Sequence, residues 1–118
     1  MPLLANVVIA LVALLHVWFL VLEMFLWERP MGLRAFGQTR AAAAASKVLA
    51  ADQGLYNGFL AAGLAWGLWL GPDGLGVKVF FLSCVLVAGL FGGLTASRKI
   101  LIVQALPAAL GLVLLFLA

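Results

Sequence analysis

Long apolar stretches alternate with short polar segments along this chain. Four such stretches cover residues of about 3–27, 48–70, 77–96 and 100–117. Each contains roughly 18–25 residues, the length that an α-helix needs to cross about 30 Å of hydrocarbon. No alternation of polar and apolar side chains, which would indicate strands, competes with this pattern. The sequence therefore predicts an all-α fold, a four-helix transmembrane bundle that forms a single domain.

The composition supports a membrane location. Of the 118 residues, 67% are hydrophobic and 9% are charged, whereas about half of a soluble domain is apolar and about a quarter is charged. So short a chain cannot bury that much apolar surface in a core of its own, and lipid is the expected solvent. The net charge of +3 does not indicate a nucleic-acid partner, because the basic residues lie between apolar stretches rather than in one patch.

Basic residues predict the orientation. The first and third polar segments contain Arg29, Arg34, Arg40, Lys47, Arg98 and Lys99, and the second contains only Lys78. Because positively charged loops stay in the cytoplasm, we expect a multi-pass protein of the inner (plasma) membrane with both termini outside the cytoplasm. The first segment also contains an alanine run, residues 41–45. Alanine favours helix, so helix two is expected to begin near Arg40; the alternative is a flexible loop.

Two ionisable side chains interrupt the first apolar stretch. His16 and Glu23 are seven residues apart, almost two helical turns, and share one face, which Leu20 and Trp27 extend. An ionisable group in a membrane helix costs about 2.5–3.5 kcal/mol on insertion scales and usually has a function. We expect Glu23 to be a catalytic acid or base with His16 as its partner. The alternatives are surface exposure or an arginine pair for Glu23, and a hydrogen bond from His16 to a neighbouring carbonyl.

The intramembrane polar residues converge on the cytoplasmic half of the predicted bundle. A rise of about 1.5 Å per residue places Glu23 about 6 Å and His16 about 16 Å from the cytoplasmic boundary. The second and fourth helices bring polar residues to the same half, namely Asp52, Gln53, Tyr56, Asn57 and Gln104. With Trp27 they predict a ligand-binding pocket that opens toward the cytoplasm. The alternative is a self-contained hydrogen-bond network that fixes helix register, with Asp52 as a cap or ion-pair partner and Tyr56 as an interfacial anchor.

Other kinds of site lack the residues they require. One histidine and one cysteine far apart do not form a zinc site, no serine is placed with a base for a triad, and there is no glycine fingerprint for phosphates. We therefore expect no metal and no cofactor, and we interpret Cys84 as a small buried residue. Three glycine pairs have small-xxx-small spacing, Gly54 with Gly58, Gly63 with Gly67, and Gly89 with Gly93. Such pairs allow close helix contacts and predict packing within the bundle or in a homodimer.

Several strings of the sequence carry a family resemblance. They are Leu22–Trp27, Asp52–Leu60, Lys78–Phe81, Arg98–Leu101 and Val103–Ala108. With these strings the chain resembles a bacterial and fungal family of small membrane proteins, known as domain of unknown function 1304. The resemblance covers nearly the whole chain and implies four spans and no assigned activity. Asp52 stands where the family pattern has asparagine, so the resemblance weakens the case that the chemistry needs its carboxylate.

Functions from different classes fit these features. The first is a membrane-embedded enzyme or binding protein for a lipid-soluble small molecule, in which Glu23 exchanges a proton and neighbouring amides orient the ligand. The second is a proton-coupled exporter similar to small multidrug resistance transporters, which requires a homodimer because four helices are too few to enclose a transport path. The third is a structural subunit of a membrane complex. The expected partners are membrane lipid and a hydrophobic small molecule.

Overall fold

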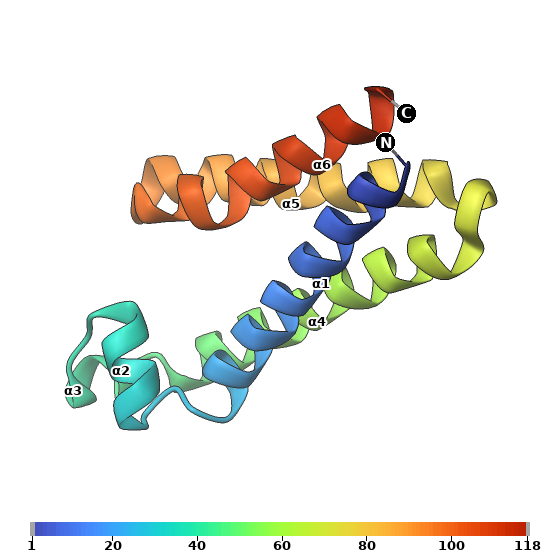
Figure 1. Ribbon diagram of the computed structural model, residues 1–118. Helices are drawn as coiled ribbons and strands as arrows, with labels where there is room; N and C mark the ends of the chain where they lie inside the picture. Colours follow the sequence, from blue (N-terminus) through green and yellow to red (C-terminus); the bar gives the residue numbers. More distant parts are fainter. Residues whose placement is uncertain (1, 118) are drawn as a thin grey trace. The chain divides into compact units, whose positions relative to one another are not determined.

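The computed structural model describes residues 2–117, which contain helices and no strand. The elements are α1 (Pro2–Met24), α2 (Pro30–Phe36), α3 (Arg40–Ala45), α4 (Lys47–Leu70), the 3-10 helix η1 (Gly71–Gly74), α5 (Leu75–Thr95), the π-helix η2 (Leu101–Ala105) and α6 (Leu106–Leu117) (Figure 1). The prediction of an all-α fold is therefore confirmed. The chain forms two compact units, of which unit 2 is Leu15–Phe59 and unit 1 contains the residues on either side of it.

Two stretches of the described chain are long and apolar enough to cross a membrane. Pro2–Met24 has a mean hydropathy of 2.5, and Lys47–Thr95, which contains α4 and α5, reaches 2.2; Leu101–Leu117 is a shorter apolar helix. Only 28% of the most apolar window in each long stretch is buried inside the protein, whereas the core helix of a soluble protein is mostly buried. These helices thus have the length, composition and exposed apolar surface expected of membrane segments.

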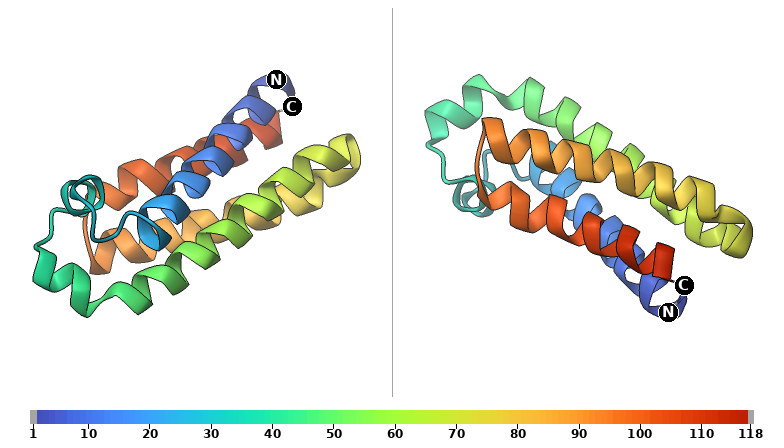
Figure 2. Two further views of the ribbon diagram at one scale, coloured as in Figure 1. Left: turned by 90° about the horizontal axis from the view of Figure 1, so that it is seen from below. Right: turned by 90° about the horizontal axis from the view of Figure 1, so that it is seen from above.

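Unit 1 has a filled apolar core. The first part of α1, the second half of α4, α5 and α6 contribute to it, and its buried members are Ile9, Val12, Leu64, Leu82, Val85 and Ala108. In Figure 2, α5 and α6 lie side by side. A Cβ atom at Gly89 would lie 2.6 Å from the backbone nitrogen of Ala105, so the missing side chain lets α5 approach η2 closely.

The π-helix η2 has a local cause. Pro107 has no backbone N–H, and its ring would collide with the carbonyl of Val103 in a regular α-helix. The wider turn of η2 ends shortly before this proline. The predicted fourth span, 100–117, is therefore one apolar stretch whose first turns are wider than an α-helix.

A tight turn joins α4 to α5 in unit 1. Gly71 has a φ of +62°, in the left-handed region that favours glycine. Lys78 lies buried in α5, and its Nζ donates to Asn6 Oδ1 at 3.1 Å and to the Gly71 carbonyl at 3.3 Å. The prediction that Lys78 belongs to a polar loop is wrong, because its aliphatic stem is buried while its ammonium reaches acceptors. The Asn6 partner was also missed.

Unit 2 departs from the predicted helix ends. The first helix ends at Met24, earlier than predicted, because the Leu26 N–H donates to the Val21 carbonyl and widens the last turn. Trp27 therefore lies in a turn and does not extend the stripe of His16 and Glu23 along the helix. The alanine run forms α3, but Ser46 separates it from α4. The prediction that helix two begins near Arg40 is wrong for this reason.

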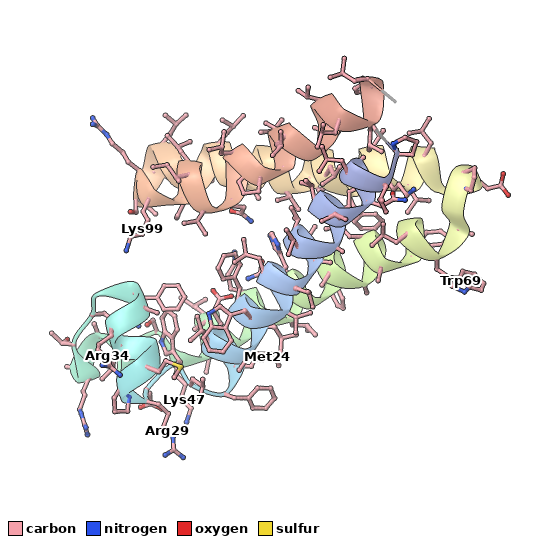
Figure 3. The ribbon with its side chains drawn as sticks, in the orientation of Figure 1. Met24, Arg29, Arg34, Lys47, Trp69 and Lys99 are labelled. Atoms are coloured by element: carbon pink, nitrogen blue, oxygen red, sulfur yellow. The ribbon has the colours of Figure 1, made fainter. Side chains whose placement is uncertain are left out.

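Short helices replace the flexible loop that was the alternative reading of the segment between α1 and α4. Pro30 begins α2, a position that suits its fixed φ, and Gly37 ends it in a left-handed conformation at φ +59°. The Thr39 hydroxyl accepts from the Ala42 N–H at 3.1 Å and caps α3. Basic side chains at Arg29, Arg34 and Lys47 project from this part of unit 2 (Figure 3).

The glycine pairs pack against neighbours within the chain. In unit 2, Gly54 and Gly58 face the Leu20–Met24 part of α1; in unit 1, Gly63 and Gly67 face Phe81 and Lys78, and Gly89 and Gly93 face Ala105 and Leu101. All six positions are thus occupied by internal contacts. The homodimer stays a prediction, but these glycines no longer argue for it.

Candidate functional site

An open groove of about 510 Å³ lies entirely within unit 2. Its lining residues come from the end of α1, the turn that follows, the junction of α3 and α4, and the first half of α4: Glu23, Trp27, Ser46, Leu49, Ala50, Asp52, Gln53 and Tyr56. The two charged lining residues are both acidic, and the basic side chains of this unit lie outside the groove. The groove therefore combines an apolar wall with a negative charge.

Glu23 is the buried polar group of the groove. It lies in the last turn of α1, is 9% exposed, and its Oε1 accepts a hydrogen bond of 2.5 Å from Asn57 Nδ2 on α4. A Cβ atom at Gly54 would lie 3.2 Å from the Glu23 Cβ and 2.6 Å from the Met24 Cγ. The glycine therefore lets α4 lie close to α1 beside the carboxylate, and Asn57, also buried, fixes the carboxylate's position.

Three further polar lining residues lie on α4 and are exposed. Asp52 and Tyr56 are four residues apart and share a helix face, and Gln53 lies beside them. Tyr56 is 54% exposed, and its ring centroid lies 6.1 Å from that of Phe59. These three side chains are free to rearrange around a bound molecule, whereas Glu23 is held in place.

Trp27 forms a rigid part of the groove wall. Its indole Nε1 donates to the Ala43 carbonyl at 3.1 Å and to Ser46 Oγ at 3.2 Å, at the junction of α3 and α4. Its ring centroid lies 4.8 Å from that of Phe36 on α2. The tryptophan thus links the turn after α1 to both short helices, and its ring is oriented before any ligand binds.

The structure brings together most of the predicted site. Five predicted residues line the groove, namely Glu23, Trp27, Asp52, Gln53 and Tyr56, and Asn57 is joined to them through its bond to Glu23. His16 is fully buried on α1, with its ring 5.2 Å from that of Phe19, and it is not a lining residue. Gln104 lies in η2 of unit 1 and is not a lining residue either. The roles expected for these two residues stay predictions.

Three lining residues were missed by the sequence reasoning. They are Ser46, Leu49 and Ala50; Leu49 and Ala50 precede Gln53 by four and three positions, and Ser46 precedes Ala50 by four. Because residues at this spacing share a helix face, the positions of Gln53 and Tyr56 contained a signal that could have found them.

The chemistry available to the groove is that of a carboxyl group with hydrogen-bond donors and aromatic rings. Within residues 2–117, no group of three His, Cys, Asp or Glu side chains is placed to hold a metal ion. A carboxyl group can give or take a proton, and the amides of Asn57 and Gln53 can orient a polar group. The site is therefore suited to binding and proton exchange.

Comparisons with known proteins agree with the resemblance seen in the sequence. The model of a family described as protein of unknown function (DUF1304) matches residues 10–116. The uncharacterized protein YpaA of Lactococcus lactis subsp. lactis (strain IL1403) is 28% identical over 115 residues, which cover 96% of this chain and 97% of that protein. No solved structure matches the chain.

Proposed function

Because the chain belongs to the DUF1304 family, whose function is unknown, we propose a function from the groove of unit 2 itself. The protein binds a lipid-soluble small molecule in this groove and exchanges a proton with it through Glu23. Trp27 and Tyr56 supply aromatic contacts to the molecule, Gln53 orients its polar part, and Asn57 holds the Glu23 carboxyl group in position. Whether the bound molecule is also converted depends on its own chemistry.

One observation carries this proposal. Glu23 is buried to nine-tenths, yet it lines an open groove and its Oε1 is held by the Asn57 amide. A carboxyl group with only a structural role could be enclosed on all sides, whereas Glu23 is accessible from the groove. A buried and oriented acid beside an open cavity is the arrangement expected of a ligand site.

The proposed setting is the inner membrane, crossed four times. In this arrangement α1, α4, α5 and the η2–α6 stretch are the spans, both termini lie outside, and the groove is in the cytoplasmic half. The basic side chains that project from unit 2 support this orientation. Cysteine labelling in a Cys84→Ser background tests it: residues near Thr39 are expected to be inaccessible from outside intact cells, and external labelling there would reverse the orientation.

The exporter alternative receives less support. It requires a second copy of the chain, and the glycine pairs that favoured a homodimer face neighbours in the same chain. Binding at the groove, by contrast, requires only residues of unit 2.

Purification with and without the carboxylate tests the function. Wild type, Glu23→Gln and the control Glu28→Gln are purified from the same membranes in mild detergent, and their organic extracts are compared by mass spectrometry. A lipid-soluble compound is expected in wild type and roughly tenfold less of it in Glu23→Gln, because a hydrogen bond to a charged group contributes about 1.5–3 kcal/mol.

The control separates the groove from general charge loss. Glu28 pairs with Lys47 at 3.5 Å on the surface, where ion pairs contribute little, so Glu28→Gln is expected to match wild type. Glutamine at position 23 keeps an oxygen that accepts from Asn57, so the fold is expected to persist. Identical extracts from all three proteins would contradict the proposal.

A further inference from the structure

The groove has a charge pattern that selects among lipid-soluble molecules. The charged residue types that line it, Glu23 and Asp52, are both acidic, and neither lysine nor arginine is a lining residue. Lys47, the basic residue nearest to the lining residues in sequence, is paired with Glu28. The groove therefore offers two acidic groups and no basic group to whatever enters it.

Aromatic rings accompany these carboxylates. Trp27 is fixed by two hydrogen bonds from its indole, and the Phe36 ring packs against it. Tyr56 lies on the same face of α4 as Asp52. Aromatic faces attract cations, and tryptophan does so most strongly. A cation gains from both the rings and the carboxylates, whereas an anion is repelled by both.

The apolar lining residues of the groove indicate that the ligand also has an apolar part. Leu49 and Ala50 line it, and Leu49 is 73% exposed beside the exposed Val48. An inorganic cation would leave this surface uncovered, and no described group of acidic residues is placed to hold a metal. The occupant must therefore pair a positive charge with an apolar body.

We propose that the groove of unit 2 binds an amphiphilic organic cation, with Glu23 and Asp52 as its counter-charges and Trp27 and Tyr56 around its charged end. This proposal rests on the proposed function, since it names the class of molecule that the same groove takes. Asn57 holds Glu23 in place, and the exposed side chains of Asp52 and Tyr56 adapt to the size of the cation.

Two probes of the same shape and opposite charge test the proposal. Tetraphenylphosphonium and tetraphenylborate are titrated into the purified full chain, and saturable binding is measured by equilibrium dialysis against protein-free detergent. Tetraphenylphosphonium is expected to bind, with affinity about tenfold weaker in Glu23→Gln and about threefold weaker in Asp52→Asn, because Asp52 is solvated and its charge is screened. Tetraphenylborate is expected not to bind.

The variants keep the test decisive if one of them misfolds. Asp52 is exposed, so Asp52→Asn is expected to fold even if Glu23→Gln does not, and Glu28→Gln and Asp73→Asn serve as matched controls outside the groove. Equal binding of both probes, or equal losses in the controls, would overturn the cation assignment. If the cation fails to bind but a neutral or acidic compound co-purifies in a Glu23-dependent way, the cation assignment falls and the proposed function stands. If neither occurs, both fall.

Discussion

The two units of this protein differ in the side chains that line their grooves. Unit 1 has an apolar core, and its helices approach closely at glycines such as Gly89. Its buried Lys78 donates to Asn6, and the groove along its α5, of about 550 Å³, is lined by uncharged residues between Phe80 and Phe91. Unit 2 buries polar groups, Glu23 and Asn57 among them, and keeps an open groove beside them. Close packing gives a helical protein its stability, whereas a groove with a buried acid contributes little to stability and much to binding.

Irregular helix ends accompany the same difference. In unit 1 one tight turn at η1 joins two long helices. In unit 2 the chain leaves α1, forms the short helices α2 and α3, and begins α4 only after Ser46. That detour places Trp27 against the groove. The groove of unit 2 therefore depends on the segment between α1 and α4, where the long apolar stretches of the sequence are interrupted.

The largest effect is expected where a polar residue of unit 2 belongs to its packing. His16 is fully buried and does not line the groove, so His16→Ala should lower the free energy of unfolding by about 2–5 kcal/mol, as for other large buried side chains. Thermal unfolding in detergent measures this change, with the exposed Val17→Ala as control. The amount of compound bound per folded protein should stay near that of wild type; a specific loss of binding would place His16 in the site.

A smaller loss is expected from filling a close contact in unit 1. A Cβ at Gly89 would collide with the Ala105 backbone, which cannot move aside as a flexible side chain can. Gly89→Ala should therefore cost about 1–3 kcal/mol of unfolding free energy. Gly76 lies on the same helix with nothing within 4 Å of its Cβ position, so Gly76→Ala should be neutral or slightly stabilising. Equal effects of the two substitutions would contradict the packing of unit 1.

The smallest change in unfolding free energy is expected when Trp27 loses the hydrogen bonds of its indole. Trp27→Phe keeps a ring beside Phe36 but removes the donor to the Ala43 carbonyl and Ser46 Oγ. The expected cost is about 1 kcal/mol, with faster hydrogen exchange in α3 and unchanged exchange in α5. Trp69, which is 82% exposed at the end of α4, provides the control substitution Trp69→Phe. No change in α3 exchange would show that Trp27 does not order this segment.

The sequence predicted the helices well and their ends less well. Long apolar runs determine where helices form, because their side chains need an apolar environment over a whole span. They do not determine where helix one ends, since Phe25, Leu26 and Trp27 continue the run beyond Met24. Likewise the alanine run favours helix on both sides of Ser46, and only tertiary contacts, such as the Trp27 indole bond, decide that α3 and α4 are separate.

The candidate site was predictable where it followed a helix face. Helical spacing and similar depth grouped Asp52, Gln53 and Tyr56 with Glu23, and these residues line one groove. Depth alone also grouped Gln104 with them; this residue belongs to unit 1 and does not line this groove, and its expected role stays a prediction. Lys78 was misplaced for a different reason. Its charge suggested a loop, but its long aliphatic stem is buried in α5 and its ammonium group donates to Asn6.

A crystal structure of the wild-type protein, purified from its own membranes in mild detergent, tests the central claim most directly. The account predicts electron density for a bound molecule in the groove of unit 2, with its polar end beside Glu23 and Trp27 and its apolar part against Leu49. The same map would contradict the account if side chains closed the groove. Density confined to the exposed apolar face of α5 that contains Phe80 and Phe91 would contradict it as well.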